Sequence, residues 1–92
     1  MAGWTFLTHH AHVLLQVAQD PDATIEQIAS VVGVTSRSAV SILNDLEATG
    51  YIERERRGRR NHYVVHPEQP LRHPSNAAHT VGELIAALSD LR

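Results

Sequence analysis

The chain has 92 residues, 42% of them hydrophobic, which suits one domain with a small core and leaves little room for a second. It contains no cysteine, so disulfide bonds, thiol catalysis and cysteine-ligated zinc are excluded, and a reducing, intracellular setting is favoured. The formal net charge of −2 is unevenly spread, because residues 1–50 hold one arginine against five carboxylates, whereas residues 51–62 hold five arginines against two.

The N-terminal segment MAGWTFLTHH has neither the basic region nor the long apolar run of a signal peptide. No apolar stretch of the chain approaches the roughly 20 residues that a membrane-spanning helix needs. We therefore expect a cytoplasmic protein that does not associate with a membrane.

A first helix is predicted over about residues 8–19, with Thr8 as its N-terminal cap. Apolar residues recur along it at helical spacing, and these are Val13, Leu15, Val17 and Ala18. Asp20 precedes Pro21 and is therefore pushed out of the helical region, which ends the helix.

A second helix is predicted to begin at Thr24, because Thr24 and Gln27 form the pattern of a capping box. Its inward face consists of Ile25, Ile28, Ala29 and Val32. Gly33 suits the left-handed conformation that ends a helix and begins a turn. Val34 is then expected to enter the core.

The third helix, predicted over about residues 36–49, combines an apolar face with a polar one made of small side chains. The apolar face consists of Ala39, Ile42, Leu43 and Leu46, and Gly50 ends the helix. Small polar side chains can enter a DNA major groove about 12 Å wide, and an arginine can bind a guanine through two hydrogen bonds. The candidate DNA contacts here are Thr35, Ser36, Arg37, Ser38, Ser41 and Asn44. A solvated helix face without a ligand is the alternative.

A β-hairpin is predicted from residues 51–56 and 61–66, joined by a loop at residues 57–60 that contains Gly58. Its arginines are Arg54, Arg56, Arg57, Arg59 and Arg60. Like charges this close repel one another unless an anion lies nearby, and a DNA backbone supplies such an anion. We therefore take these arginines as candidate DNA contacts too, with a solvated charged turn as the alternative.

Three prolines, Pro67, Pro70 and Pro74, predict an extended connection after the hairpin. A last helix is predicted over about residues 75–91, with apolar residues at Ala78, Val81, Leu84, Ile85, Leu88 and Leu91. Its apolar face either closes the core of its own subunit or packs against a second copy. Because the core is small, we favour a homodimer, and we expect Trp4 and Phe6 to join the same interface or to cover the first helix.

The small and apolar positions of a bacterial helix-turn-helix are matched by Ile28, Ala29, Gly33, Val34, Ala39 and Ile42. The segment LEATGYIERERRGRRNHYVV resembles the end of the recognition helix and the wing of winged-helix regulators of the MarR and ArsR types. This resemblance covers roughly residues 8–66. It implies a mainly α fold with a β-hairpin wing, namely a winged helix-turn-helix domain at residues 1–66. Residues 67–92 would form an extended connection and an additional C-terminal helix, as a dimerisation or core-closing element.

The resemblance also implies a function, that of a sequence-specific DNA-binding transcriptional regulator acting on double-stranded DNA. The recognition helix, about residues 36–49, would enter the major groove, and the wing, residues 54–62, would contact the backbone or the minor groove. Arg54 matches a basic position that contacts phosphate or supports the wing. A winged-helix protein–protein interaction module without DNA binding is the alternative, in keeping with the acidic first half. An enzyme is not expected, because no nucleophile–base pair, phosphate-binding loop or pair of carboxylates is evident.

Seven histidines are many for this length, and three of them fall in the sequence HHAH at residues 9–12. His9 and His12 could share a metal ion with a distant residue such as His73 or His79, but tetrahedral zinc needs about four ligands. We expect polar, partly exposed histidines and no metal or other cofactor. Near the wing, His62 and His66 would gain charge at mildly acidic pH and strengthen DNA binding.

Overall fold

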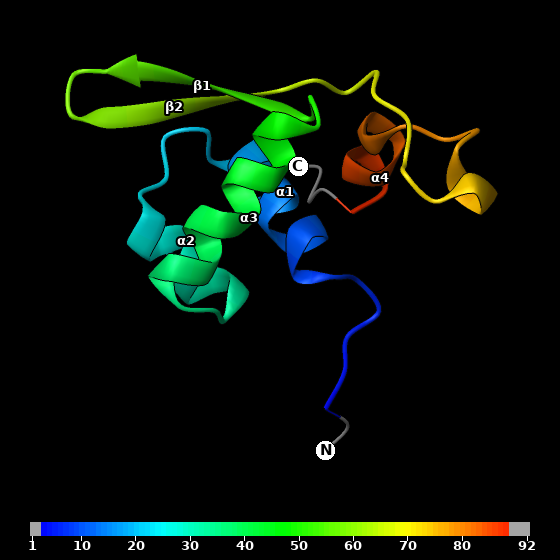
Figure 1. The fold of residues 1–92 in the computed structure, drawn as a ribbon, viewed down its shortest axis with the longest axis horizontal. Coiled ribbons are helices and arrows are strands. Elements are labelled where there is room, and N and C mark those ends of the chain that lie inside the picture. The colour runs from blue at the N-terminus through cyan, green and yellow to red at the C-terminus, as the bar shows by residue number, and fades with distance from the viewer. Residues whose placement is uncertain (1–2, 89–92) are drawn as a thin grey trace.

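The computed structural model describes residues 3–88. This part of the chain forms four α-helices, a two-stranded antiparallel sheet and one short 3-10 helix (Figure 1). In chain order the elements are α1 (His9–Gln19), α2 (Ile25–Val32), α3 (Ser36–Ala48), β1 (Ile52–Arg57), β2 (Arg60–Val65), the 3-10 helix (Pro74–Asn76) and α4 (Val81–Leu88). The predicted fold class, a mainly α winged helix-turn-helix with an additional C-terminal helix, is confirmed.

The predicted starts of the first three helices are confirmed, and a threonine side chain fixes each of them. Each threonine accepts a hydrogen bond from the backbone N–H three residues further on; these are Thr8, Thr24 and Thr35. The capping box of α2 is complete, because the Gln27 side chain accepts a hydrogen bond from the Thr24 N–H at 2.9 Å. Gly33 has a φ of 85°, a left-handed conformation that a glycine adopts without strain, and it turns the chain from α2 into α3.

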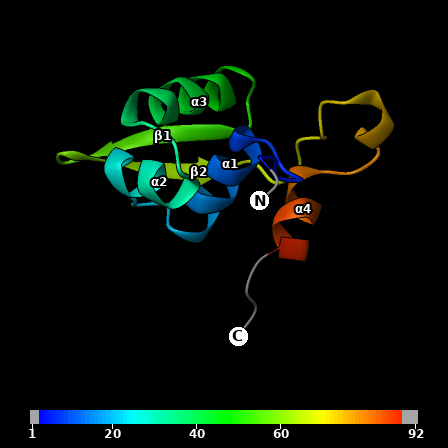
Figure 2. The ribbon, with the colours of Figure 1, turned by 90° about the horizontal axis from the view of Figure 1, so that it is seen from below.

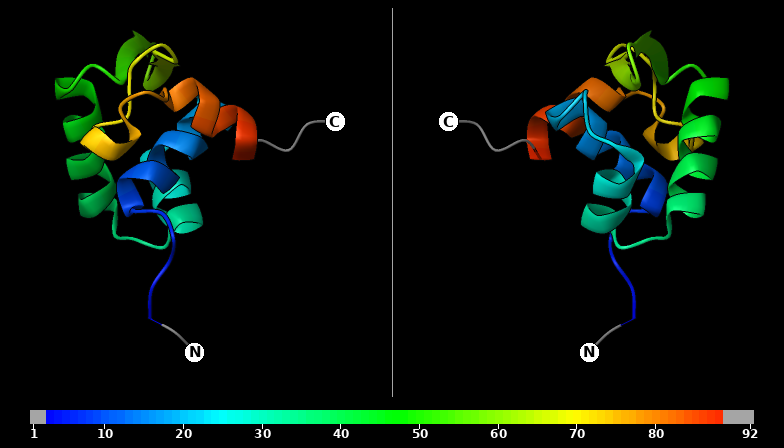
Figure 3. Two further views of the ribbon diagram at one scale, coloured as in Figure 1. Left: turned by 90° about the vertical axis from the view of Figure 1, so that its right-hand side faces the viewer. Right: turned by 90° about the vertical axis from the view of Figure 1, so that its left-hand side faces the viewer.

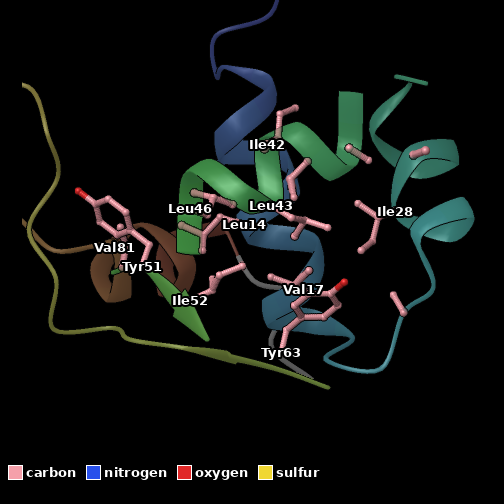
Figure 4. Packing of buried hydrophobic residues seen from close by; sticks show 14 residues of the cluster. Leu14, Val17, Ile28, Ile42, Leu43, Leu46, Tyr51, Ile52, Tyr63 and Val81 are labelled. Carbon is pink, nitrogen blue, oxygen red and sulfur yellow. The ribbon is translucent and has the colours of Figure 1, made fainter. Parts of the chain in front are cut away.

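The core lies between α1, α2, α3 and the base of the hairpin (Figure 4). The predicted apolar face of α3 is entirely buried, and its members are Ala39, Ile42, Leu43 and Leu46. On α1 the prediction needs one correction, because Leu14 is buried and the predicted Leu15 is only half-buried. Leu15 instead lines a surface pocket between α1 and the end of α2.

The hairpin turn is tighter than predicted. The strands pair from Ile52 opposite Val65 to Arg57 opposite Arg60, so only Gly58 and Arg59 remain in the turn rather than residues 57–60. Gly58 has a φ of 63°, the conformation that a two-residue hairpin turn requires. The ladder therefore extends into the arginine-rich segment, and the closed end of the hairpin projects beyond the helices (Figure 1).

The C-terminal region differs from its prediction. In place of one helix from residue 75, the chain forms the 3-10 helix and a turn before α4 begins at Val81. A second capping box sets this start, because the Thr80 Oγ1 accepts from the Glu83 N–H at 3.2 Å and the Glu83 Oε2 accepts from the Thr80 N–H at 2.8 Å. Ala78 consequently lies before the helix and not on its apolar face, and Leu91 lies outside the described residues.

α4 lies to one side of the three-helix core (Figure 2) and is joined to it by its first turn. Val81 is part of the core, and the N–H groups of Val81 and Gly82 donate to the carbonyls of Gln69 and Pro67, each at 2.9 Å. A Cβ at Gly82 would lie 2.8 Å from the Pro67 carbonyl oxygen, so glycine permits this close approach. α4 thus closes the core of its own chain at one end, while Leu88 at its other end is exposed. Within residues 3–88, no helix has the length and apolar character needed to cross a membrane.

Candidate nucleic-acid interface

α3 runs along one edge of the molecule, with α1 and α2 on its inner side (Figure 3). The predicted contacts on this helix are all exposed to solvent; these are Ser36, Arg37, Ser38, Ser41 and Asn44. The structure therefore brings five predicted site residues together on one open helix face.

At the start of α3, the Thr35 side chain is hydrogen-bonded within the helix, whereas the Arg37 side chain has no partner among residues 3–88. The Thr35 hydroxyl accepts from the Ser38 N–H at 3.0 Å and donates to the Ser38 Oγ at 3.1 Å, so it serves as the helix cap. The Arg37 guanidinium makes no hydrogen bond or ion pair with another residue in the described part of the chain. Arg37 thus has its full hydrogen-bonding capacity for an external acceptor, beside helix N–H groups that also attract anions.

Val40 is a surface residue of α3 that the sequence analysis does not single out. Its side chain is 38% exposed, although valine is apolar. It lies one turn after Ser36 and one turn before Asn44, on the edge of the polar face. In a major groove such a side chain can contact the methyl group of thymine. In the sequence, Val40 is an apolar residue that falls outside the helical spacing of the buried residues of α3. This mismatch is the signal that could have identified it.

Arg54 links β1 to α3. Its Nη2 donates to the Glu47 Oε1 at 2.6 Å and to the Asn44 Oδ1 at 2.8 Å, and its Nε donates to the same Glu47 oxygen at 3.1 Å. The hydrogen bond from Arg54 lowers the pKa of the Glu47 carboxyl below its ordinary value, and the attraction between the two charges acts in the same direction. Arg54 therefore neutralises an acidic group on α3 and occupies the amide oxygen of Asn44.

The four arginines nearer the tip of the hairpin are exposed, but three of them also bond within the protein. The pairs are Arg56 Nε with Gly58 O (2.9 Å), Arg57 Nη2 with Glu55 Oε1 (3.2 Å) and Arg60 Nη1 with Asp22 O (3.4 Å). Arg59, in the turn itself, forms no hydrogen bond or ion pair with any residue in 3–88. Because exposed pairs of this kind are weak, a phosphate group can compete for these guanidinium groups.

A second acidic group on α3 also has a basic neighbour. The Asp45 carboxylate lies 2.8 Å from the His10 Nε2 of α1, with both side chains about half exposed. The Asp45 carboxylate is therefore held by a contact with α1, whereas the negative charge of Glu47 is offset by the fixed charge of Arg54.

The histidines do not assemble into a metal site within residues 3–88, where no group of three His, Cys, Asp or Glu side chains is placed to hold an ion. Four of them lie against carboxylates, namely His10, His62, His66 and His79. His73 accepts a hydrogen bond from the Ser75 N–H at 3.1 Å. His9 and His12 line a surface pocket of about 380 Å³ between α1 and the end of α2.

Comparisons with known proteins identify a family and several similar folds. The sequence model of the MarR family matches residues 4–60. A search of curated proteins found no match. Among solved structures, the chain is similar to Streptococcus pneumoniae FabT, crystallised in complex with DNA, with 28% identity over 71% of this chain and 48% of FabT, and a TM-score of 0.58.

Two further structures share the fold. Staphylococcus aureus MepR, a transcription regulator of the multidrug efflux pump MepA, is 20% identical over 88% of this chain and 56% of its own, with a TM-score of 0.59. The homodimeric winged helix-turn-helix DNA-binding domain of a possible ArsR-family regulator from Mycobacterium bovis is 22% identical over 96% and 86%, with a TM-score of 0.60. The chain thus spans about half the length of FabT and MepR.

Proposed function

This chain belongs to the MarR family, and from that premise we propose that it is a sequence-specific, DNA-binding transcriptional regulator. One observation carries the proposal: the free guanidinium of Arg37 stands at the exposed start of α3, and an arginine-rich hairpin projects from the same domain. FabT, the relative whose structure contains DNA, supports this assignment at 28% identity.

The two basic features have different proposed roles. α3 enters the major groove, where Arg37 and the neighbouring serines meet base edges, because residues near the N-terminus of a recognition helix usually reach the bases. The hairpin contacts the phosphate backbone or the minor groove, where its charges contribute affinity through the release of counterions. Arg59 is the first candidate for such a contact, because it has no partner among residues 3–88.

We also propose that two copies of the chain act together on DNA. One α3 can read only a short half-site, and paired half-sites one helical turn apart, about 34–36 Å, match the symmetry of a dimer. The related Mycobacterium bovis domain, to which this chain is similar over 96% of its length, is homodimeric.

Selection of bound duplexes from a random DNA library, followed by affinity measurements on the selected duplex, tests the proposal. We expect an enriched palindromic motif and an affinity that falls steeply between about 50 mM and 200 mM salt. The triple variant Arg57→Ala, Arg59→Ala and Arg60→Ala should bind all sequences more weakly. When the logarithm of its affinity is plotted against the logarithm of the salt concentration, the slope should be less steep by up to about 0.9 for each phosphate contact that is lost.

The matched control is Arg72→Ala, since Arg72 is also exposed but lies in the connection after the hairpin. Its affinity should stay close to that of the unaltered protein. If no duplex is enriched and affinity does not respond to salt, DNA binding is refuted, and the interaction-module alternative is favoured.

A further inference from the structure

The loop between α1 and α2, residues 20–23, lies alongside β2 of the hairpin (Figure 1). Three contacts connect them, each further toward the hairpin tip. The Tyr63 N–H donates to the Pro21 carbonyl at 2.8 Å, the His62 Nδ1 lies 2.7 Å from the Asp22 Oδ1, and the Arg60 Nη1 donates to the Asp22 carbonyl at 3.4 Å. We call residues 20–23 the wing seat.

The wing seat is itself held firmly. The ring of Pro21 fixes its backbone angle φ. The Asp22 N–H donates to the Asp20 Oδ1 at 3.3 Å, and the Ala23 N–H donates to the Asp20 carbonyl at 3.1 Å. Ala23 is buried in the core, so the seat cannot move without disturbing the packing below it. It therefore offers the hairpin a fixed support.

The hairpin has its other firm attachment at its base. Tyr63 is buried in the core, and Arg54 bonds to α3. Beyond these residues the arginine-bearing end projects from the domain, and the only hydrogen bonds or ion pairs that join it to another element among the described residues are those with Asp22. Within residues 3–88, Asp22 is therefore the residue best placed to influence the angle of this end to α3.

Asp22 keeps its negative charge beside these arginines. The hydrogen bond from His62 lowers the pKa of the Asp22 carboxyl below its ordinary value, and the nearby charges of His62, Arg57 and Arg60 act in the same direction. By charge alone such a carboxylate should weaken binding to DNA, because it repels phosphate. If Asp22 assists DNA binding, it must therefore do so by positioning the hairpin and not through its charge.

We propose that Asp22 is a positioning residue for DNA binding, which holds the wing through His62 at the angle at which the hairpin arginines meet the DNA backbone. This inference rests on the proposed function. Since a carboxylate only accepts hydrogen bonds, Nδ1 of His62 carries the hydrogen that joins the pair. This bond joins the hairpin to the α1–α2 loop, so it can hold the wing against the seat.

Other ionisable groups face this pair. Glu55 lies opposite His62 across the hairpin and is itself paired with Arg57. The Arg60 side chain donates to the Asp22 carbonyl, and the Asp20 side chain accepts a hydrogen bond from the Asp22 N–H. A test of the Asp22–His62 contact must therefore leave these other charges in place.

A comparison of Asp22→Ala with Glu26→Ala isolates the role of Asp22. Glu26 is exposed in the first turn of α2 and lines the same groove as Arg59 and Arg60. Each variant removes one negative charge near the hairpin, but only Asp22→Ala removes the contact with His62. The affinity of each for the selected duplex is measured at constant pH and constant ionic strength. The third variant is His62→Gln, which keeps a hydrogen-bond donor but never gains a charge.

Asp22→Ala should bind DNA about fivefold more weakly than Glu26→Ala, the size of effect expected for a partly exposed ion pair. His62→Gln should retain more affinity than Asp22→Ala, because its side-chain amide can still donate a hydrogen bond to the Asp22 carboxylate. Asp22→Ala binding as tightly as Glu26→Ala overturns the proposal.

Exchange of the Tyr63 amide hydrogen gives a readout that needs no DNA. It should be faster in Asp22→Ala than in Glu26→Ala, because the Tyr63 N–H lies next to the lost contact in the wing seat. If the unaltered protein bound no DNA, the proposed function would fail, and amide exchange would still show whether Asp22 holds the hairpin. Equal exchange in the two variants refutes that role.

Discussion

Arg37 is the only arginine on α3, and its place in the first turn gives it a different expected role from the hairpin arginines. A guanidinium that pairs with guanine must meet two acceptors in one plane, which only one base edge provides. A guanidinium on a phosphate has no such restriction and carries no information about sequence. Arginine is therefore expected to provide sequence selectivity at position 37 and sequence-independent affinity in the hairpin.

Arg37→Ala should reduce discrimination at one base pair by about 1–3 kcal/mol, with little change at other positions. Val40→Ala should have a smaller effect and should act where the selected site contains thymine, because it removes an apolar contact with the thymine methyl group. Affinities for the selected duplex and for its single-base-pair variants would measure both effects. An equal loss on every duplex would reject a base-reading role for Arg37.

At the scale of elements, Arg54 determines how β1 is joined to α3. Its guanidinium bonds to two α3 side chains, and the pair with Glu47 is partly exposed, at 24% for Arg54 and 39% for Glu47. Solvent therefore screens the attraction, and a contribution of up to about 1 kcal/mol to the free energy of unfolding is expected.

This contribution depends on pH with a definite sign. Because the pKa of Glu47 is lower in the folded state than its ordinary value of 4.5, the pair stabilises the fold above that value, and the effect is lost as the pH falls through the folded pKa. Arg54→Met should thus be destabilised in urea unfolding at neutral pH by about 0.5–1 kcal/mol and should approach the unaltered protein in acid. Arg56→Met is the control, since Arg56 bonds only within the hairpin turn. A loss for Arg54→Met that is the same at both pH values would contradict the assignment.

The elements that the sequence predicts well are those fixed by local chemistry. Threonine caps and left-handed glycines act over three or four residues, so Thr8, Thr24, Thr35 and Gly33 set the helix ends where they were expected. The buried stripe of α3 follows from helical periodicity in the same way. The start of α4 shows the limit, because apolar spacing favours an earlier start, whereas the Thr80–Glu83 capping box and the close contact of Gly82 with Pro67 decide it.

Contacts between distant segments could not be predicted. The sequence places arginines in the hairpin, but only the fold shows that Arg54 turns toward α3 while Arg59 stays free. Asp22 and His62 lie 40 residues apart in the chain, and nothing in the pattern of either segment indicates that they meet. Such pairings depend on the register of the hairpin against the α1–α2 loop, which is a property of the tertiary structure.

At the scale of the whole molecule, α4 gives the chain a face that its own core does not use. Val81 is buried in the core, but Leu88 at the far end of the helix is 48% exposed. The surface beside this helix is apolar as well, since Val65, Pro67 and Ala86 line a shallow pocket there. A domain of this size buries a limited share of its apolar surface, so burial of this face between two copies would add stability.

We therefore predict that the chain is a dimer in solution and that Leu88→Glu shifts it toward the monomer, because a carboxylate in an apolar interface is costly to desolvate. Val31→Glu is the matched control, since Val31 is 66% exposed on α2, away from α4. Sedimentation velocity over a range of concentrations distinguishes the two species. Leu88→Glu should also lose affinity for a palindromic duplex while keeping its weaker affinity for a single half-site, because only coupled half-sites need the dimer. A dimer unaffected by Leu88→Glu, or abolished by Val31→Glu, would place the interface elsewhere.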